Sequence, residues 1–249
     1  MTASASLEDG FPRIENVGLD GVLVRFGDSL NEPANRAALA LRAALESDPV
    51  AGTLEVSTSL VSTFLRFDPL AVTPDALAEA LRARLMGRDW FAAPLPEGRR
   101  RIRIPTVYDT AFAPQFEEAA AEAGVSPDAA RKALSEAEVR VTAIGFAPGQ
   151  PYLGTLPERW DIPRQTGLTP QVPAGALVLA IRQFVLFSVA APTGWRHVGQ
   201  TAATLFDRSR DEPFLLRPGD LVQFPAVAPE TFANMRAAGQ DGIEMEAVS

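Results

Sequence analysis

The sequence contains no cysteine and a single histidine among its 249 residues. The absence of cysteine excludes disulfides, thiolate nucleophiles and cysteine-ligated metals. One histidine, His197, leaves no histidine cluster for a metal ion and no Cys–His pair. A Ser-His-Asp triad would have to use His197, but the Gly-x-Ser-x-Gly turn that carries the serine of many hydrolases does not occur. We therefore expect no metal site and no cysteine or serine nucleophile.

Basic residues are outnumbered, with 23 Lys and Arg against 31 Asp and Glu, which gives a net charge of −8. Binding to nucleic acid needs a basic face that replaces counterions, so we expect no nucleic-acid partner. The one basic run, Arg99 to Arg101 with Arg103, favours a solvated linker and strand start over a phosphate site.

Long apolar runs are also missing, although 47% of the residues are hydrophobic, which is enough for a real core. The longest run, Ala176 to Ala191, has Arg182 and Gln183 in its middle and is too short to span a bilayer. The first ten residues lack the basic-then-apolar pattern of a signal peptide. We expect a cytoplasmic protein with no membrane partner, and the length favours two domains.

Residues 12–93 predict an α+β domain. Asn31 and Thr73 are typical N-caps, each followed by a helix with one apolar face. Strands are predicted at 21–26, 52–57 and 63–67, and weakly at 89–93. The order strand, helix, two strands, helix, strand indicates a ferredoxin-like fold. Residues 92–98, with two prolines and a glycine, form the predicted linker.

Residues 99–228 change to short strands separated by Gly/Pro turns, interrupted by a helical pair at 114–123 and 127–134. Many strands with few helices indicate a closed or nearly closed β-barrel. The clearest predicted strands are 102–107, 139–144, 177–181, 184–190 and 220–224. Residues 229–249 are expected to form a short helix and then a loose acidic tail.

Three loops of this second domain are rich in glycine and proline: 145–154, 172–176 and 191–199. Glycine allows backbone angles closed to other residues, and proline fixes φ, so both together specify shaped, rigid loops. We expect the three loops to surround one pocket.

The second domain also carries an ordered series of motifs: Gly-Phe-Ala-Pro-Gly at 145–149, Pro-Ala-Gly at 173–175, Gly-Trp at 194–195 and Pro-Gly-Asp at 218–220. The series resembles the B-type subunit of 5-oxoprolinase, a family also known as allophanate hydrolase subunit 1, Kip-type histidine-kinase inhibitor and carboxyltransferase subdomain C and D. The resemblance covers about residues 12–235. It implies an α+β ferredoxin-like domain followed by a mostly-β cyclophilin-like barrel.

The resemblance further implies one subunit of an ATP-dependent hydrolase that opens a lactam or a related amide. Its usual partner is a second cyclophilin-like barrel, the C-type subunit of 5-oxoprolinase, and self-association is the alternative. The sequence has no Walker-type glycine loop, so ATP would be bound by barrel loops or shared with the partner.

Several polar positions of the family are changed in this chain. The Pro-Gly-Phe usual in the family is Pro148-Gly149-Gln150, and an arginine before Thr201 is Gln200. Family positions that bear a histidine, a serine or another hydroxyl are apolar here: Leu134, Val139, Ala176, Phe184 and Phe187. A more apolar pocket suits a more apolar ligand, because an unpaired buried polar group costs about 1–3 kcal/mol.

Two candidate catalytic residues follow. Arg164 is suited to bind a carboxylate or phosphate, with a surface salt bridge as the alternative. His197 is suited to carry a proton near pH 7, with a partly exposed strand histidine as the alternative. Trp195 and Tyr152 are either pocket walls or ordinary packing. The candidate substrate-binding residues are Phe146, Pro148, Gly149, Gln150, Tyr152, Pro173, Gly175, Phe184, Phe187, Trp195 and Thr201.

Two alternatives to the hydrolase subunit remain open. A diverged, stand-alone barrel would bind or transform an apolar metabolite in a biosynthetic pathway. A regulatory protein, like the Kip-type inhibitor, would instead dock on a kinase or another partner. The substrate is expected to be a small molecule in the first two cases.

Overall fold

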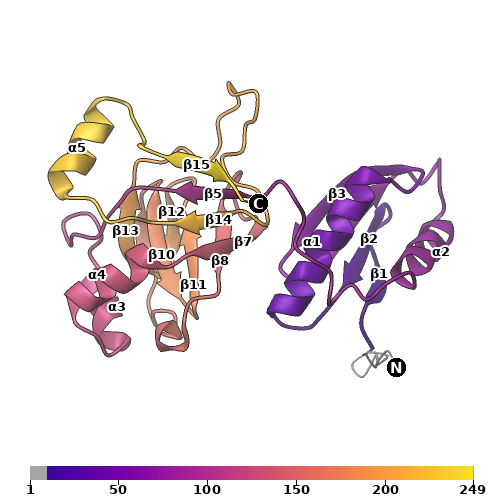
Figure 1. Ribbon diagram of the computed structural model, residues 1–249, viewed down its shortest axis with the longest axis horizontal. Helices are drawn as coiled ribbons and strands as arrows, with labels where there is room; N and C mark the ends of the chain where they lie inside the picture. Colours follow the sequence, from indigo (N-terminus) through magenta and orange to yellow (C-terminus); the bar gives the residue numbers. More distant parts are fainter. Residues whose placement is uncertain (1–9, 249) are drawn as a thin grey trace. The chain divides into compact units, whose positions relative to one another are not determined.

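A computed structural model describes residues 10–248, and the chain divides into two compact units with the boundary between Glu97 and Gly98 (Figure 1). Each unit has its own buried core. Among the described residues no helix is long and apolar enough to cross a membrane.

The first unit is a four-stranded antiparallel sheet with two helices. Its elements are β1 (Arg13–Val17), β2 (Gly21–Arg25), α1 (Glu32–Ser47), β3 (Thr53–Ser59), β4 (Ser62–Phe67) and α2 (Pro74–Leu85), and the sheet order is β1-β2-β4-β3. Asn31 and Thr73 accept the backbone N–H groups of Ala34 and Ala76, which confirms both predicted N-caps.

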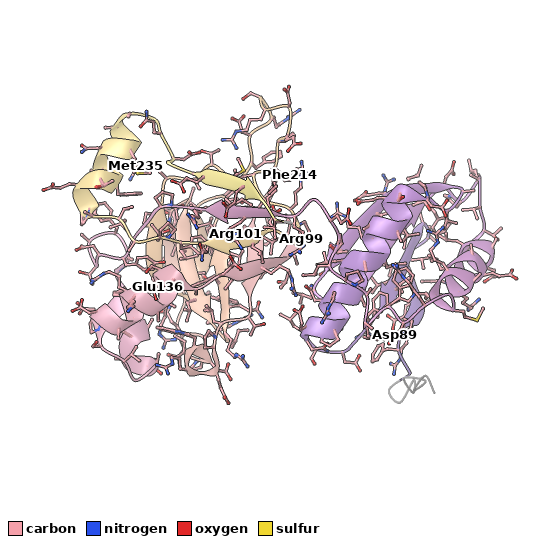
Figure 2. All side chains as sticks on the ribbon, in the orientation of Figure 1. Asp89, Arg99, Arg101, Glu136, Phe214 and Met235 are labelled. Atoms are coloured by element: carbon pink, nitrogen blue, oxygen red, sulfur yellow. The ribbon has the colours of Figure 1, made fainter. Side chains whose placement is uncertain are left out.

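The strand predicted at 89–93 is wrong. Asp89 (Figure 2) accepts the backbone N–H groups of Phe91 and Ala92 through Oδ1, an Asx turn that competes with extended backbone. Trp90 is buried, and its Nε1 donates to the carbonyl of Leu85 at 3.1 Å. The place beside β2 belongs instead to β1, which joins it in a hairpin. The ferredoxin-like assignment of this unit stays a prediction.

The second unit is built on a nine-stranded sheet with the order β15-β5-β14-β7-β8-β11-β10-β13-β6. Figure 1 shows its strands turning from nearly horizontal at β5 and β14 to nearly vertical at β10 and β11, so the sheet curls into a half-barrel. The strands are β5 (Arg100–Arg103), β6 (Thr106–Val107), β7 (Val139–Ile144), β8 (Pro151–Gly154), β10 (Ala176–Ala180), β11 (Gln183–Leu186), β13 (Arg196–Thr201), β14 (Leu221–Gln223) and β15 (Glu244–Ala247). The other elements are α3 (Phe116–Glu122), α4 (Pro127–Glu136), the 3-10 turn η1 (Glu158–Trp160), α5 (Pro229–Ala237) and a separate pair of strands, β9 (Thr169–Val172) and β12 (Ala191–Thr193).

The two faces of the curled sheet bury different clusters, because successive strand residues point to opposite sides. On β10, Leu177 and Leu179 join the main core together with α3 and α4, whereas Val178 and Ala180 join a smaller cluster. This smaller cluster, which we call the inner cluster, consists of Val172, Ala176, Val178, Ala180, Val185, Phe187, Ala191 and Trp195, with Tyr152 packed against it. Its side of the sheet carries the pocket described below.

The C-terminal tail is not wholly loose, because residues 244–247 pair with β5 as the antiparallel strand β15. Arg101 of β5 (Figure 2) contacts Glu246 at 2.8 Å and Glu138 at 2.6 Å. Arg100 reaches the buried carboxylate of Asp220 at 2.5 Å. The arginine run expected to be a solvated linker therefore has ion-pair partners at these positions.

Candidate functional site

A pocket of about 380 Å³ opens beside the inner cluster. The loops 145–154 and 191–199 both contribute to it, together with the segment before β9. It is lined by Phe146, Gln150, Tyr152, Arg164, Gln165, Leu168, Val185, Phe187, Pro192, Thr193, Gly194 and Trp195. We call it the aromatic pocket.

The loop 172–176, the third that was predicted to surround this pocket, does not line it. Pro173 and Thr201 line a different pocket of about 560 Å³. Gly175 lies in the left-handed region, with a φ of +78°, and a Cβ added there would stand 2.4 Å from the carbonyl oxygen of Thr201. This glycine is thus explained by close backbone packing. The aromatic pocket therefore does not meet the expectation of one pocket surrounded by all three loops, because among the described residues the loop 172–176 lines the other pocket instead.

The first loop shapes one wall of the aromatic pocket. Gly149 has a φ of +73°, and a Cβ there would lie 2.8 Å from the carbonyl oxygen of Leu205. Phe146 also has a positive φ, 72°, and the residue is 73% exposed. Pro148 and Gly149 belong to this loop but do not line the pocket. Gln150 does line it, and only 2% of this residue is exposed.

Arg164 gives the aromatic pocket its cation. The residue is exposed, and its guanidinium carbon lies 5.4 Å from the centre of the Trp195 ring, within the range of a cation–π contact. Arg164 forms no ion pair with any residue in the range 10–248, so the alternative of a surface salt bridge is not realised. The stacked position leaves its N–H donors open to an anionic ligand.

A chain of amides fixes the floor beside Trp195. Gln165 donates through Nε2 to the carbonyl of Trp195 at 2.9 Å, and its Oε1 accepts from Gln115 at 2.5 Å. Gln115 in turn accepts the backbone N–H of His197 through Oε1 at 2.7 Å. Gln165 and Leu168 line the pocket but were not among the predicted site residues. Gln165 directly follows the candidate residue Arg164 and Leu168 lies four positions after it, and this closeness in sequence was the available signal.

His197 is a buried residue of β13, only 4% exposed, and it does not line either of the two pockets. The alternative of a partly exposed strand histidine is therefore wrong on one point: His197 is on a strand, but it is buried. Burial lowers the pKa of His197, while the backbone of Gly199 and the amide of Gln200 act in the opposite direction. Its Nε2 has no hydrogen-bond partner among the described residues. A neutral, enclosed imidazole of this kind is poorly placed to exchange protons with a ligand in the aromatic pocket.

Most of the apolar replacements noted in the sequence lie outside the aromatic pocket. Leu134, Val139 and Phe184 are in the main core, where Phe184 packs edge-on against Phe224. Ala176 is buried in the inner cluster, and only Phe187 lines the pocket. Phe184 is thus a core residue. Of the five apolar replacements that predicted a more apolar pocket, only Phe187 lines the aromatic pocket.

The lining of the aromatic pocket includes one arginine, neutral amides and aromatic rings, and it includes no carboxylate. Among residues 10–248 no group of three His, Asp or Glu side chains is arranged to hold a metal ion. These groups have the chemistry to hold an anionic ligand with a flat or apolar body.

Comparison with known proteins adds the decisive observation. Residues 12–216 match the family model of the carboxyltransferase domain, subdomain C and D. The chain belongs to this family. Its aromatic pocket, which spans residues 146–195, lies wholly within the matched region.

Relatives of this carboxyltransferase-domain protein carry a consistent name. A protein of Bacillus subtilis (strain 168), named as the B-type subunit of 5-oxoprolinase, is 30% identical over 227 residues, which cover 88% of this chain and 95% of the relative. A protein of Escherichia coli O157:H7 with the same name is 41% identical over 152 residues, covering 61% of this chain and 69% of the relative. The crystal structure of TTHA0988 superimposes with a TM-score of 0.71 and 32% identity over 84% of this chain, which spans 40% of that longer protein.

Proposed function

We propose that this chain is one subunit of an ATP-dependent hydrolase that cleaves the C–N bond of a lactam or a related amide, with 5-oxoproline as the model substrate. The name shared by its relatives supports this reading, as does the near-complete coverage of the Bacillus subtilis protein. A ferredoxin-like first unit and a cyclophilin-like barrel are the folds that the proposal assigns to the two units.

The observation that carries the proposal is the presence of Arg164 beside the neutral amides Gln150 and Gln165 in the aromatic pocket. Arg164 would bind the carboxylate of the substrate, held in place by its stacking on Trp195. Tyr152 and Phe187 would cover the faces of the ring. Positioning of this kind lowers the barrier by holding the reacting bond against groups supplied from elsewhere.

ATP does not fit the aromatic pocket of this chain by itself. A triphosphate with its metal ion is usually held by several cations, backbone amides and carboxylates. The pocket lining offers one arginine and no carboxylate. We therefore assign the nucleotide, and the groups that transfer protons, to a partner subunit of the second barrel type, with a second copy of this chain as the alternative partner.

The test is co-purification of the full chain with a second barrel subunit and measurement of 5-oxoproline-dependent ATP hydrolysis. We expect turnover by the pair, and Arg164→Ala should lower kcat/KM about 10- to 100-fold, because one charge-assisted contact of about 1.5–3 kcal/mol is lost. Arg159→Ala, which removes an exposed arginine outside the pocket, should leave kcat/KM within twofold. No turnover by any purified pair, or equal losses in both variants, contradicts the proposal.

A second function is favoured by the exposed apolar side chains of the aromatic pocket. Phe146 is 73% exposed and Leu168 is 72% exposed, and both line it. A stand-alone barrel that binds an apolar metabolite would use these side chains directly. Thermal-shift measurements on the isolated chain separate the two readings: stabilisation by apolar metabolites and none by 5-oxoproline supports the stand-alone barrel.

A further inference from the structure

Gln150 places an unused amide in the wall of the aromatic pocket. The residue is 2% exposed, its Oε1 is buried without a partner, and its side chain makes no hydrogen bond to the part of the chain that the structure describes. The neighbouring amide differs completely. Gln165 donates to Trp195 and Thr169 and accepts from Gln115.

The loop itself does not need the Gln150 side chain. Its backbone N–H donates to the carbonyl of Ala147 at 3.1 Å, and its carbonyl accepts from Gly145 at 3.0 Å, which closes the turn. Buried side-chain polar groups in folded proteins almost always have partners. An amide that stabilises nothing in the fold, yet lines a pocket, therefore indicates a ligand that supplies the partner.

We propose that Gln150 determines substrate specificity by pairing with the amide edge of the ligand, an inference that rests on the proposed function of this pocket. A primary carboxamide carries an N–H and a C=O on one edge. A lactam does the same, because its ring holds the amide cis. Two such edges pair through two antiparallel hydrogen bonds, and a 180° turn of the Gln150 amide exchanges its oxygen and nitrogen to suit.

This pairing selects between classes of amide. The trans amide of a peptide places its N–H and C=O on opposite sides, so one carboxamide satisfies only one of them. An N-alkylated lactam keeps the carbonyl but lacks the donor, which leaves the Gln150 acceptor buried and unpaired. The pocket thus accepts lactams and primary amides that also carry a carboxylate for Arg164, and it rejects peptides and N-alkylated lactams.

The experiment compares binding of 5-oxoproline and N-methyl-5-oxoproline to the full chain by titration calorimetry. We expect the wild-type chain to bind the N–H lactam at least about tenfold more tightly, a difference of 1.4 kcal/mol. In Gln150→Leu the two affinities should come within about twofold. The matched control is Gln171→Leu, at an exposed glutamine of β9 outside the pocket, which should keep the tenfold preference.

Thermal unfolding of the same variants separates specificity from a structural role. Because Gln150 makes no hydrogen bond within the fold, Gln150→Leu should unfold at the same temperature as the wild type or higher. A clearly lower midpoint, with the lactam preference retained, would show that the amide supports the loop instead and would overturn the inference.

The remaining outcomes assign failure to one proposal or the other. Equal wild-type affinity for both lactams, with hydrolysis of 5-oxoproline by the paired subunits, overturns only the role of Gln150. A clear preference for the N–H lactam without any hydrolysis by the pair overturns only the proposed function. A wild-type chain that binds neither lactam overturns both.

Discussion

His197 shows how a single residue links burial to pH. It sits on β13, faces Val178 across the ladder and is 4% exposed. Burial lowers the pKa of this imidazole below the ordinary value of 6.5, so the folded state binds its proton less readily than the unfolded state does. The stability contributed by the neutral ring is present above pH 6.5 and is lost as the pH falls through the lower folded pKa.

We therefore expect the free energy of unfolding to decrease between pH 7.5 and pH 5.5, by at most about 1.4 kcal/mol per pH unit. Urea denaturation at several pH values measures this, in a range above the usual carboxylate pKa values. In His197→Gln the curve should be flatter over the same range. An identical slope in that variant would mean that other groups cause the pH dependence.

Some of the site residues could be predicted from the sequence and others could not. Phe146, Gln150, Tyr152, Arg164, Phe187 and Trp195 were predicted and line one pocket. Phe184 and Phe187 looked equivalent in the sequence, but they differ by an odd number of positions and point to opposite faces of the sheet. The face of the sheet that joins the main core is the one against which α3 and α4 pack. The residues of the strand itself carry no pattern that predicts where these helices pack.

At the scale of elements, Asp220 joins the turn before β14 to β5. Its carboxylate is buried and accepts from the side chain of Arg100 and from the backbone N–H groups of Arg100 and Arg217. In the sequence, Pro218-Gly219-Asp220 stood out only as one motif of the family series, because a partner 120 positions away leaves no local signal.

Replacing Asp220 with Ala should destabilise the second unit by about 3–5 kcal/mol, since it leaves the Arg100 side chain and two backbone donors without their acceptor. Chemical denaturation followed by tryptophan fluorescence measures the change. Glu55→Ala, which breaks an exposed pair with Arg66, should cost less than about 1 kcal/mol. A loss for Asp220→Ala as small as that of the control would contradict the role assigned to the buried carboxylate.

Helix starts were the elements best predicted from the sequence, because an N-cap is a local arrangement. Asn31 and Thr73 each accept a backbone N–H three residues later, as expected, and Ser126 does the same before α4. Edge strands were predicted worst. β15 has the sequence Glu-Met-Glu-Ala and exposes every residue, so it has no buried face to produce an alternating pattern. The strand is held by its pairing with β5 and by ion pairs such as that between Glu246 and Arg101, which are contacts between residues far apart in the sequence.

At the scale of the whole molecule, the two units have separate cores. The buried core residues of the first unit, among them Leu41, all lie between Val22 and Ala93 in the sequence. Those of the second unit's main core, among them Phe184, lie between Ile102 and Phe224. Each core is formed by residues of one unit only, as in domains that fold by themselves. The chain should therefore not behave as a single cooperative block.

Two core substitutions test this independence. Leu41 and Phe184 are both fully buried, so Leu41→Ala should cost about 2–5 kcal/mol and Phe184→Ala about 3–5 kcal/mol. In differential scanning calorimetry each substitution should lower the unfolding temperature of its own unit and leave the other transition in place. A separate chain of residues 98–249 should unfold at the temperature of the second-unit transition, and Phe184→Ala should lower that temperature too. If either substitution shifts both transitions equally, the two cores unfold as one, and the independence inferred from their separate residues is wrong.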